Sequence, residues 1–107
     1  MPAATDHLPP ELLVRLQRTY RGHLAETRGL IAPMVDRAAA RTAGSADYAA
    51  LRHHAHKLGG SGASYGFGRL SQTGKALDEL LRTEAGAADA IGRAAQDLLA
   101  AIDEALG

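Results

Sequence analysis

The sequence contains no cysteine and no tryptophan, and its aromatic side chains are limited to three tyrosines and one phenylalanine. Without thiols the chain cannot form disulfides or thiolate zinc sites, and a reducing cytoplasm is the compartment we expect. Hydrophobic residues make up 46% of the chain but aromatic residues only 4%. The core must therefore be built largely from Leu, Ile, Val and Ala, which suit closely packed helices.

Neither sign of charge is in excess, since Lys plus Arg and Asp plus Glu both number 12. A chain with no net charge has no general attraction for nucleic acid or for an anionic membrane, so we expect neither as a partner. No apolar run approaches the roughly 18 residues needed to cross a bilayer. Residues 1–6 lack the basic and apolar regions of an export signal, which also favours a cytoplasmic protein.

Strand patterns are missing too, because no stretch shows sustained β-branched alternation and every long periodic segment fits a period near 3.6. We predict four helices, over residues 11–40, 46–65, 69–83 and 87–106. Pro33 lies inside the first and should kink it rather than end it. The short connections predict an antiparallel, up-down-up-down four-helix bundle. Residues 1–107 should form one domain, with residues 1–8 loosely ordered.

The central segment, residues 51–67, holds three of the five histidines. Apolar or small residues recur every three or four positions from Tyr48 to Tyr65, as on the buried face of an amphipathic helix. His56 lies one residue past that stripe, a rotation of about 100°. Its imidazole should therefore project from the edge of the buried face, where a nucleophile would be accessible.

Several glycines follow His56, although Gly inside a helix costs roughly 1 kcal/mol relative to Ala. Gly59 and Gly60 are helical neighbours of position 56, so we expect them to leave one side of the imidazole bare for a second protein. Gly62 falls on the buried stripe, where it would allow close helix packing. The alternative is a loop that ends the helix after Leu58, but the continuous apolar phase favours the helix.

The run His56-x-Leu58-x-Gly60-Ser61, continued by Gly66, Leu70, Leu77 and Asp78, resembles the histidine phosphotransfer (HPt) domain. It is similar also to the phosphoacceptor domain of chemotaxis histidine kinases, which has a comparable Gly-Phe-x-x-Leu continuation. The match runs without a gap from His56 through Leu81, and the rest of the chain agrees in helical pattern and length. One position departs from the family: Lys or Arg usually follows three residues after the histidine, where this chain has Gly59.

The resemblance implies that His56 accepts a phosphoryl group from one receiver-domain aspartate and passes it to another. The implied partners are response-regulator receiver domains and a hybrid histidine kinase. Mg²⁺ would belong to the receiver, so this chain would need no cofactor of its own.

The resemblance also assigns roles around His56. Asp78 stands where the family commonly has the longer Glu or Gln; by bonding to Nδ1–H it would leave Nε2 as the attacking atom. The alternative for Asp78 is a solvated surface carboxylate. Because the cation usual in the family is missing at Gly59, the neighbouring Lys57 is the candidate to stabilise the phosphoryl group instead, although it points in a different direction. Ser61 is the small residue that lets helices approach.

Other chemistry finds little support. His53 and His56 alone approximate a metal-ligand spacing, and no nearby carboxylate completes a site, so we expect no metal. No phosphate loop or kinase signature is present, which favours a phosphocarrier over an autonomous enzyme. Two alternatives remain, namely the phosphoacceptor domain of a larger sensor or chemotaxis kinase, and a helical adaptor without phosphotransfer. We expect a monomer.

Overall fold

The computed structural model describes residues 8–83 and 87–107, and within these ranges the chain is helical with no strand. Its elements are α1 (Pro10–Ala39), α2 (Ser45–Ser61), the short 3₁₀ helix η2 (Gly62–Tyr65), α3 (Gly68–Thr83) and α4 (Ala88–Leu106). The prediction of an all-α chain with four long helices is confirmed. The expectations for residues 1–7 and for a helix end at residues 84–86 lie outside the described residues.

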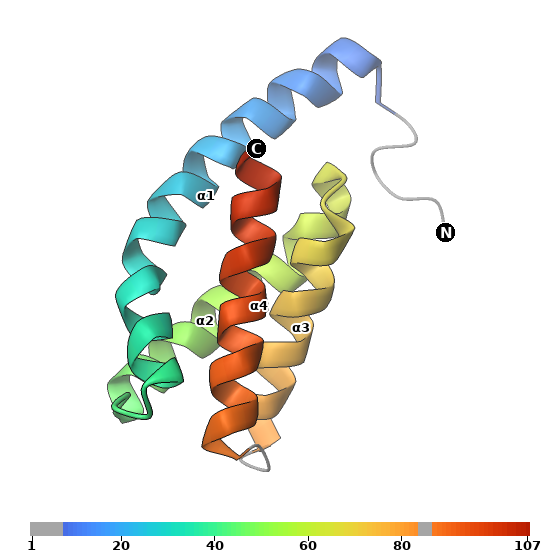
Figure 1. The fold of residues 1–107 in the computed structure, drawn as a ribbon. Helices are drawn as coiled ribbons and strands as arrows, with labels where there is room; N and C mark the ends of the chain where they lie inside the picture. The colour runs from blue at the N-terminus through green and yellow to red at the C-terminus, as the bar shows by residue number, and fades with distance from the viewer. Residues whose placement is uncertain (1–7, 84–86) are drawn as a thin grey trace.

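The long helix α1 begins at a proline and passes through another. Pro10 occupies its first position, where the missing N–H has no helical partner to lose. Pro33 lies inside the helix, which nevertheless continues to Ala39. Figure 1 shows α1 as a curved helix whose N-terminal end reaches past the neighbouring helices. The kink at Pro33 stays a prediction.

The turn between α1 and α2 is held by Asp47. Arg41 adopts a left-handed conformation (φ 62°) just after α1 ends. The Asp47 carboxylate accepts the backbone N–H of Gly44 at 3.2 Å and the Arg37 guanidinium at 2.7 and 2.9 Å. Ser45 begins α2, and the residue before it makes no side-chain capping bond. Asp47 thus stabilises the start of α2 and also joins it to α1.

Every buried hydrophobic residue that the structure describes is Leu, Ile, Val or Ala, as the composition predicted. All four helices contribute, and α4 contributes most, with residues at steps of three or four from Ile91 to Ala105. Figure 1 shows α3 and α4 side by side, with α4 starting at the end of the bundle where α3 finishes. The largest fully buried side chains are Leu24, Ile31, Val35, Leu51, Leu70, Leu77, Leu98 and Ile102.

The connection between α2 and α3 extends the histidine helix rather than breaking it. After Ser61 the chain tightens into η2, and Gly66 then adopts a left-handed φ of 88°. The alternative of a loop after Leu58 is therefore wrong, and the turn predicted around Gly66 is confirmed. From α1, the Gln17 side chain donates to the Tyr65 carbonyl at 2.7 Å and secures this turn.

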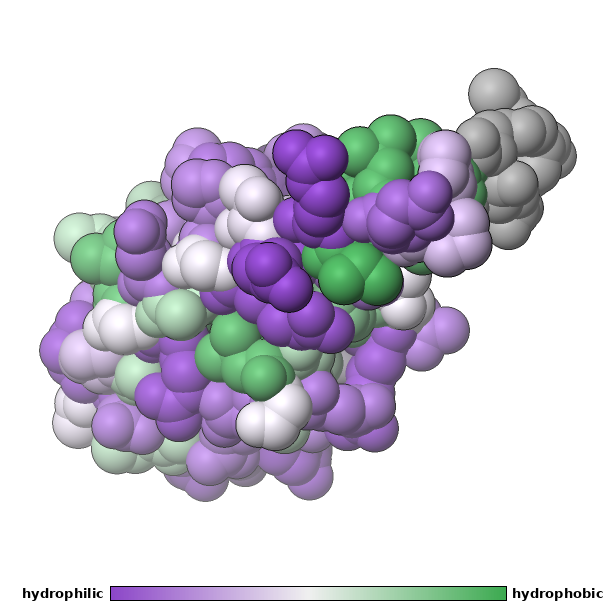
Figure 2. Space-filling view, turned by 90° about the horizontal axis from the view of Figure 1, so that it is seen from above, coloured by the Kyte–Doolittle hydropathy of each residue, from purple (hydrophilic) through white to green (hydrophobic). Residues whose placement is uncertain are grey.

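The surface carries no single apolar face in the view of Figure 2, where small hydrophobic patches are separated by polar residues. Over residues 8–83 and 87–107, the exposed large hydrophobic residues are Leu12, Val14 and Leu30, and all belong to α1. Among the described residues, no helix has both the length and the apolar character needed to cross a bilayer.

Candidate functional site

His56 projects from the outer edge of α2 and is held from α3. Its side chain is 78% exposed, and its Nδ1 lies 3.0 Å from Oδ2 of Asp78, which is only 19% exposed. A carboxylate can only accept hydrogen bonds, so Nδ1 must carry the proton in this contact. In the neutral ring Nε2 is then the unprotonated nitrogen, and it faces away from Asp78 toward solvent.

The charge on Asp78 is secured by two neighbours. The hydrogen bond from His56 lowers the pKa of the Asp78 carboxyl, and the bond from Arg52 adds to this effect, while burial opposes it. Arg52 Nε lies 3.3 Å from Oδ1, so the two carboxylate oxygens have separate partners. The sequence did not predict that Arg52 would pair with Asp78. The feature that could have indicated this contact is the position of Arg52 one helical turn before His56.

The glycines after His56 do two different things. Gly59 is buried, and a Cβ built on it would lie 3.0 Å from both the backbone N and Cγ of Lys75 on α3. The expectation that Gly59 opens space for a partner is therefore wrong, because its bare face packs on α3. Gly60 is exposed with nothing within 4 Å of a built Cβ. Only Gly60 leaves open surface one turn beyond the imidazole.

Gly74 is the counterpart of Gly59 on α3. A Cβ on Gly74 would lie 2.7 Å from Gly59 N and 2.8 Å from Ala55 O. The backbones of α2 and α3 are thus nearly in contact beside the site. The buried Ser71 hydroxyl adds a hydrogen bond to the Gly59 carbonyl. Small residues on the inner face of α3 are the feature of the sequence that indicates close helix packing. The sequence did not show that they would lie against Gly59.

Ser61 and Lys57 lie one helical turn apart near the end of α2. The Ser61 hydroxyl donates to the Lys57 carbonyl at 2.9 Å and lies 2.6 Å from the Tyr20 hydroxyl of α1. Tyr20 stacks on Tyr65 with ring centroids 4.2 Å apart. Ser61 thus links α2 to α1, which the sequence did not predict. The Lys57 side chain is exposed.

Two further histidines, His53 and His54, lie on α2 next to His56. His53 and His54 meet edge to face at 5.4 Å between centroids. A shallow depression beside the imidazole is lined by Ala49, Arg52, His53 and His56. Over the described ranges, no group of three or more His, Cys, Asp or Glu side chains is placed to hold a metal ion.

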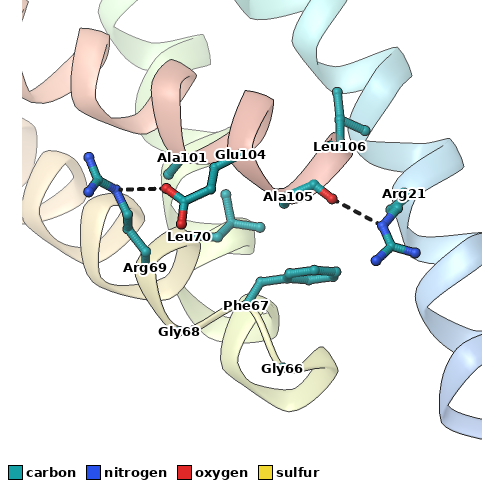
Figure 3. Close-up of a pocket in the computed structure, with 11 residues that line it drawn as sticks. Arg21, Gly66, Phe67, Gly68, Arg69, Leu70, Ala101, Glu104, Ala105 and Leu106 are labelled. Carbon is teal, nitrogen blue, oxygen red and sulfur yellow. Dashed lines mark hydrogen bonds and ion pairs between the residues drawn. The ribbon is translucent and has the colours of Figure 1, made fainter.

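A second pocket lies where α4 ends and contains none of the predicted site residues (Figure 3). There, Arg21 donates to the Ala105 carbonyl at 3.0 Å and stands 5.4 Å from the Phe67 ring centroid, while Arg69 lies 3.5 Å from Glu104. These contacts join the last turns of α4 to α1 and α3. Because both arginines are engaged within the chain, the pocket is best explained as part of the bundle end.

Comparison with known families gives a match over most of the chain. A family model described as the Hpt domain matches residues 11–107, which contain all of α2, α3 and α4 and nearly all of α1. The comparison with curated proteins and the comparison with solved structures each found no match. The match spans both His56 and Asp78.

Proposed function

Because the chain belongs to the Hpt domain family, we propose that it is a phosphorelay protein that carries a phosphoryl group on His56 between receiver-domain aspartates. Histidine phosphotransfer is the activity that this family implies. The observation that carries the assignment to His56 is the exposed ring whose Nδ1 is bonded to Asp78 at 3.0 Å. That bond leaves Nε2 as the accessible nucleophile.

The transfer step follows from this geometry. The lone pair of Nε2 forms a bond to phosphorus while the bond between phosphorus and the aspartyl carboxylate of the donor breaks, and the electron pair leaves on that carboxylate. Nδ1 keeps its proton, so the ring gains positive charge as the bond forms. The Asp78 carboxylate faces that charge and stabilises it. Return transfer to a second aspartate reverses the same steps.

The receiver domain would supply the Mg²⁺ and the acyl phosphate, and this chain supplies the ring and a docking surface. Gly60 lies one turn beyond His56 and is exposed, so a receiver would approach over it and over the adjoining Ser61. Lys57 is exposed next to His56, and a role in stabilising the phosphoryl group stays a prediction.

The rest of the proposal concerns the protein as a whole. Residues 1–107 would form one domain that acts as a monomer in the cytoplasm and is phosphorylated through a hybrid histidine kinase, and its helices would alternate in direction with α1 kinked near Pro33. A phosphoacceptor domain of a larger sensor or chemotaxis kinase would use the same chemistry. Labelling from ATP by a separate kinase domain, without a receiver intermediate, would identify that alternative.

The test is incubation with a receiver domain labelled on its aspartate. Label should move to this chain in an acid-labile, alkali-stable form and should be lost in His56→Gln. His53→Gln is the matched control, since it removes an exposed histidine one turn away and should keep the label. A chain that binds receivers without taking label is an adaptor, and that result would contradict the proposal.

A further inference from the structure

We infer that Lys75 of α3 provides the cation that contacts the phosphoryl group on His56, in place of a cation on α2. The inference rests on the proposed function and assigns a residue to the same site. At the position on α2 that faces the same way as His56, the chain has a glycine. Gly59 lies one turn after His56 on the same side of the helix, yet it has no side chain to offer.

The side chain of Lys75 runs across that position. Its Cγ is 3.0 Å from where a Cβ of Gly59 would stand, so the lysine stem covers the bare backbone of α2. On α3, Lys75 lies one turn before Asp78, which bonds to His56. His56 and Gly59 on one helix therefore face Asp78 and Lys75 on the other, across a single helical turn.

The charge of Lys75 is available for a ligand. The residue is exposed, and within residues 8–83 and 87–107 none of the ion pairs involves it. The nearby carboxylate, Asp78, already has His56 on one oxygen and Arg52 on the other. A long flexible lysine with its stem packed and its ammonium free suits a group that arrives and leaves.

Lys57 fits this role less well. It follows His56 directly, so its side chain leaves the helix about 100° around from the imidazole. Position 59 is rotated only about 60° from His56 after one turn, and the Lys75 stem lies over position 59. Position on the helix therefore favours Lys75, although Lys57 is closer in sequence.

The role that we assign to Lys75 is electrostatic. As the phosphoryl group moves from the aspartyl carboxylate to Nε2, its three outer oxygens carry negative charge. The Lys75 ammonium stabilises that charge in the transition state and in the phosphohistidine product. No proton is transferred by Lys75, so its charge rather than its acidity is what matters.

The experiment measures label transfer from a phosphorylated receiver to the full chain, together with the lifetime of the phosphohistidine and thermal unfolding. Lys75→Met keeps an unbranched apolar stem over Gly59 and removes the charge, and it should slow transfer about tenfold, as expected for loss of one charge-assisted contact. Lys75→Arg should retain most of the rate. Arg93→Met, which removes an exposed charge on α4, should match the unaltered protein.

Two results would overturn the inference while leaving the proposed function in place. One is a Lys75→Met protein that transfers as fast as the unaltered chain. The other is a Lys57→Met protein that carries the whole loss. Failure of the unaltered chain to take label from any receiver would instead overturn the proposed function and this inference with it. If Lys75→Met and Lys75→Arg both melt at a lower temperature than the unaltered chain, the lysine acts through packing.

Discussion

An imidazole that is 78% exposed has little packing to orient its ring. The direction of His56 is therefore set by its hydrogen bond to Asp78, and the charge of Asp78 is maintained by His56 and Arg52 together. Three side chains from two helices thus form one small electrostatic unit. Replacing any one of these side chains should alter the orientation or the charge of the other two.

Replacing Asp78 with Asn tests whether that unit serves transfer. The amide oxygen can still accept from Nδ1, but it carries no charge to face the ring as the bond to phosphorus forms. We expect transfer from a labelled receiver to slow by about tenfold to hundredfold, the range for losing a charge-assisted hydrogen bond worth about 1.5–3 kcal/mol. Rapid-quench kinetics would measure it. Asp97→Asn, at an exposed position on α4, should not change the rate.

The lowered pKa of the Asp78 carboxyl has a consequence for acid stability. Its pKa is lower in the folded chain than in the unfolded chain, where it is about 3.9. The ionised group therefore stabilises the fold above that pH, and its contribution is lost as the pH falls toward the folded value.

Urea unfolding of the unaltered chain and of Asp78→Asn between pH 5 and pH 2 would check this. The difference in their free energies of unfolding should be greatest at pH 5 and shrink at lower pH. Asp47 and Asp103, whose carboxyl pKa values are also lowered, are present in both proteins, so their contributions cancel. A difference that stays constant with pH would contradict the assignment.

The pair α2 and α3 carries the site because the backbones of the two helices approach closely at Gly59 and Gly74. Gly59 and Gly74 bring their backbones nearly into contact. This approach explains how Asp78 reaches His56 at 3.0 Å even though its side chain is one methylene shorter than Glu. The glycines after His56 thus set the spacing of the helices as well as leaving open surface at Gly60.

Gly74→Ala should separate these helices. The added methyl would lie 2.7 Å from Gly59 N, so a backbone must move, and we expect a loss of about 1–3 kcal/mol in the free energy of unfolding. Transfer should slow as well, because the contact between His56 and Asp78 lengthens. Chemical denaturation and transfer kinetics would measure the two effects.

Gly60→Ala is the matched control for Gly74→Ala. A methyl at Gly60 meets nothing within 4 Å, and replacing a helical Gly with Ala favours the helix by up to about 1 kcal/mol. Gly60→Ala should therefore be neutral or stabilising in the unfolding measurement. Equal losses in the two variants would show that the close approach is not what the glycines provide.

The bundle depends on an aliphatic core, and no aromatic residue is buried in the part of the chain that the structure describes. The partly buried aromatic rings Tyr20, Tyr65 and Phe67 instead stack on one another where α1 passes the turn between α2 and α3. Stability is therefore spread over many small contacts, and the site lies at the edge of this core. Folding and chemistry should be separable by mutation.

Leu98→Ala tests that separation. Leu98 is fully buried on α4, and removing most of its side chain should lower the free energy of unfolding by about 2–5 kcal/mol. Transfer by the folded protein at low temperature should stay close to that of the unaltered chain, because α4 contributes no residue to the site. A large loss of transfer in fully folded protein would show that the site depends on the core more directly.

Periodicity along the chain was enough to predict the four helices and the place of His56 at the edge of a buried stripe, and composition was enough to predict the aliphatic core. These properties are local, since they follow from helical rotation and from which side chains avoid water. The separation of 22 residues between His56 and Asp78 also agreed with a hairpin of two helices.

The distance and rotation between helices could not be read in this way. They follow from how glycines and side chains on separate elements pack together. That packing buries Gly59, brings Asp78 within reach of the ring, joins Arg52 to Asp78 and lays Lys75 over α2. The sequence gives the order of these residues but not the distances between them in space. Those distances are determined only when the helices pack together.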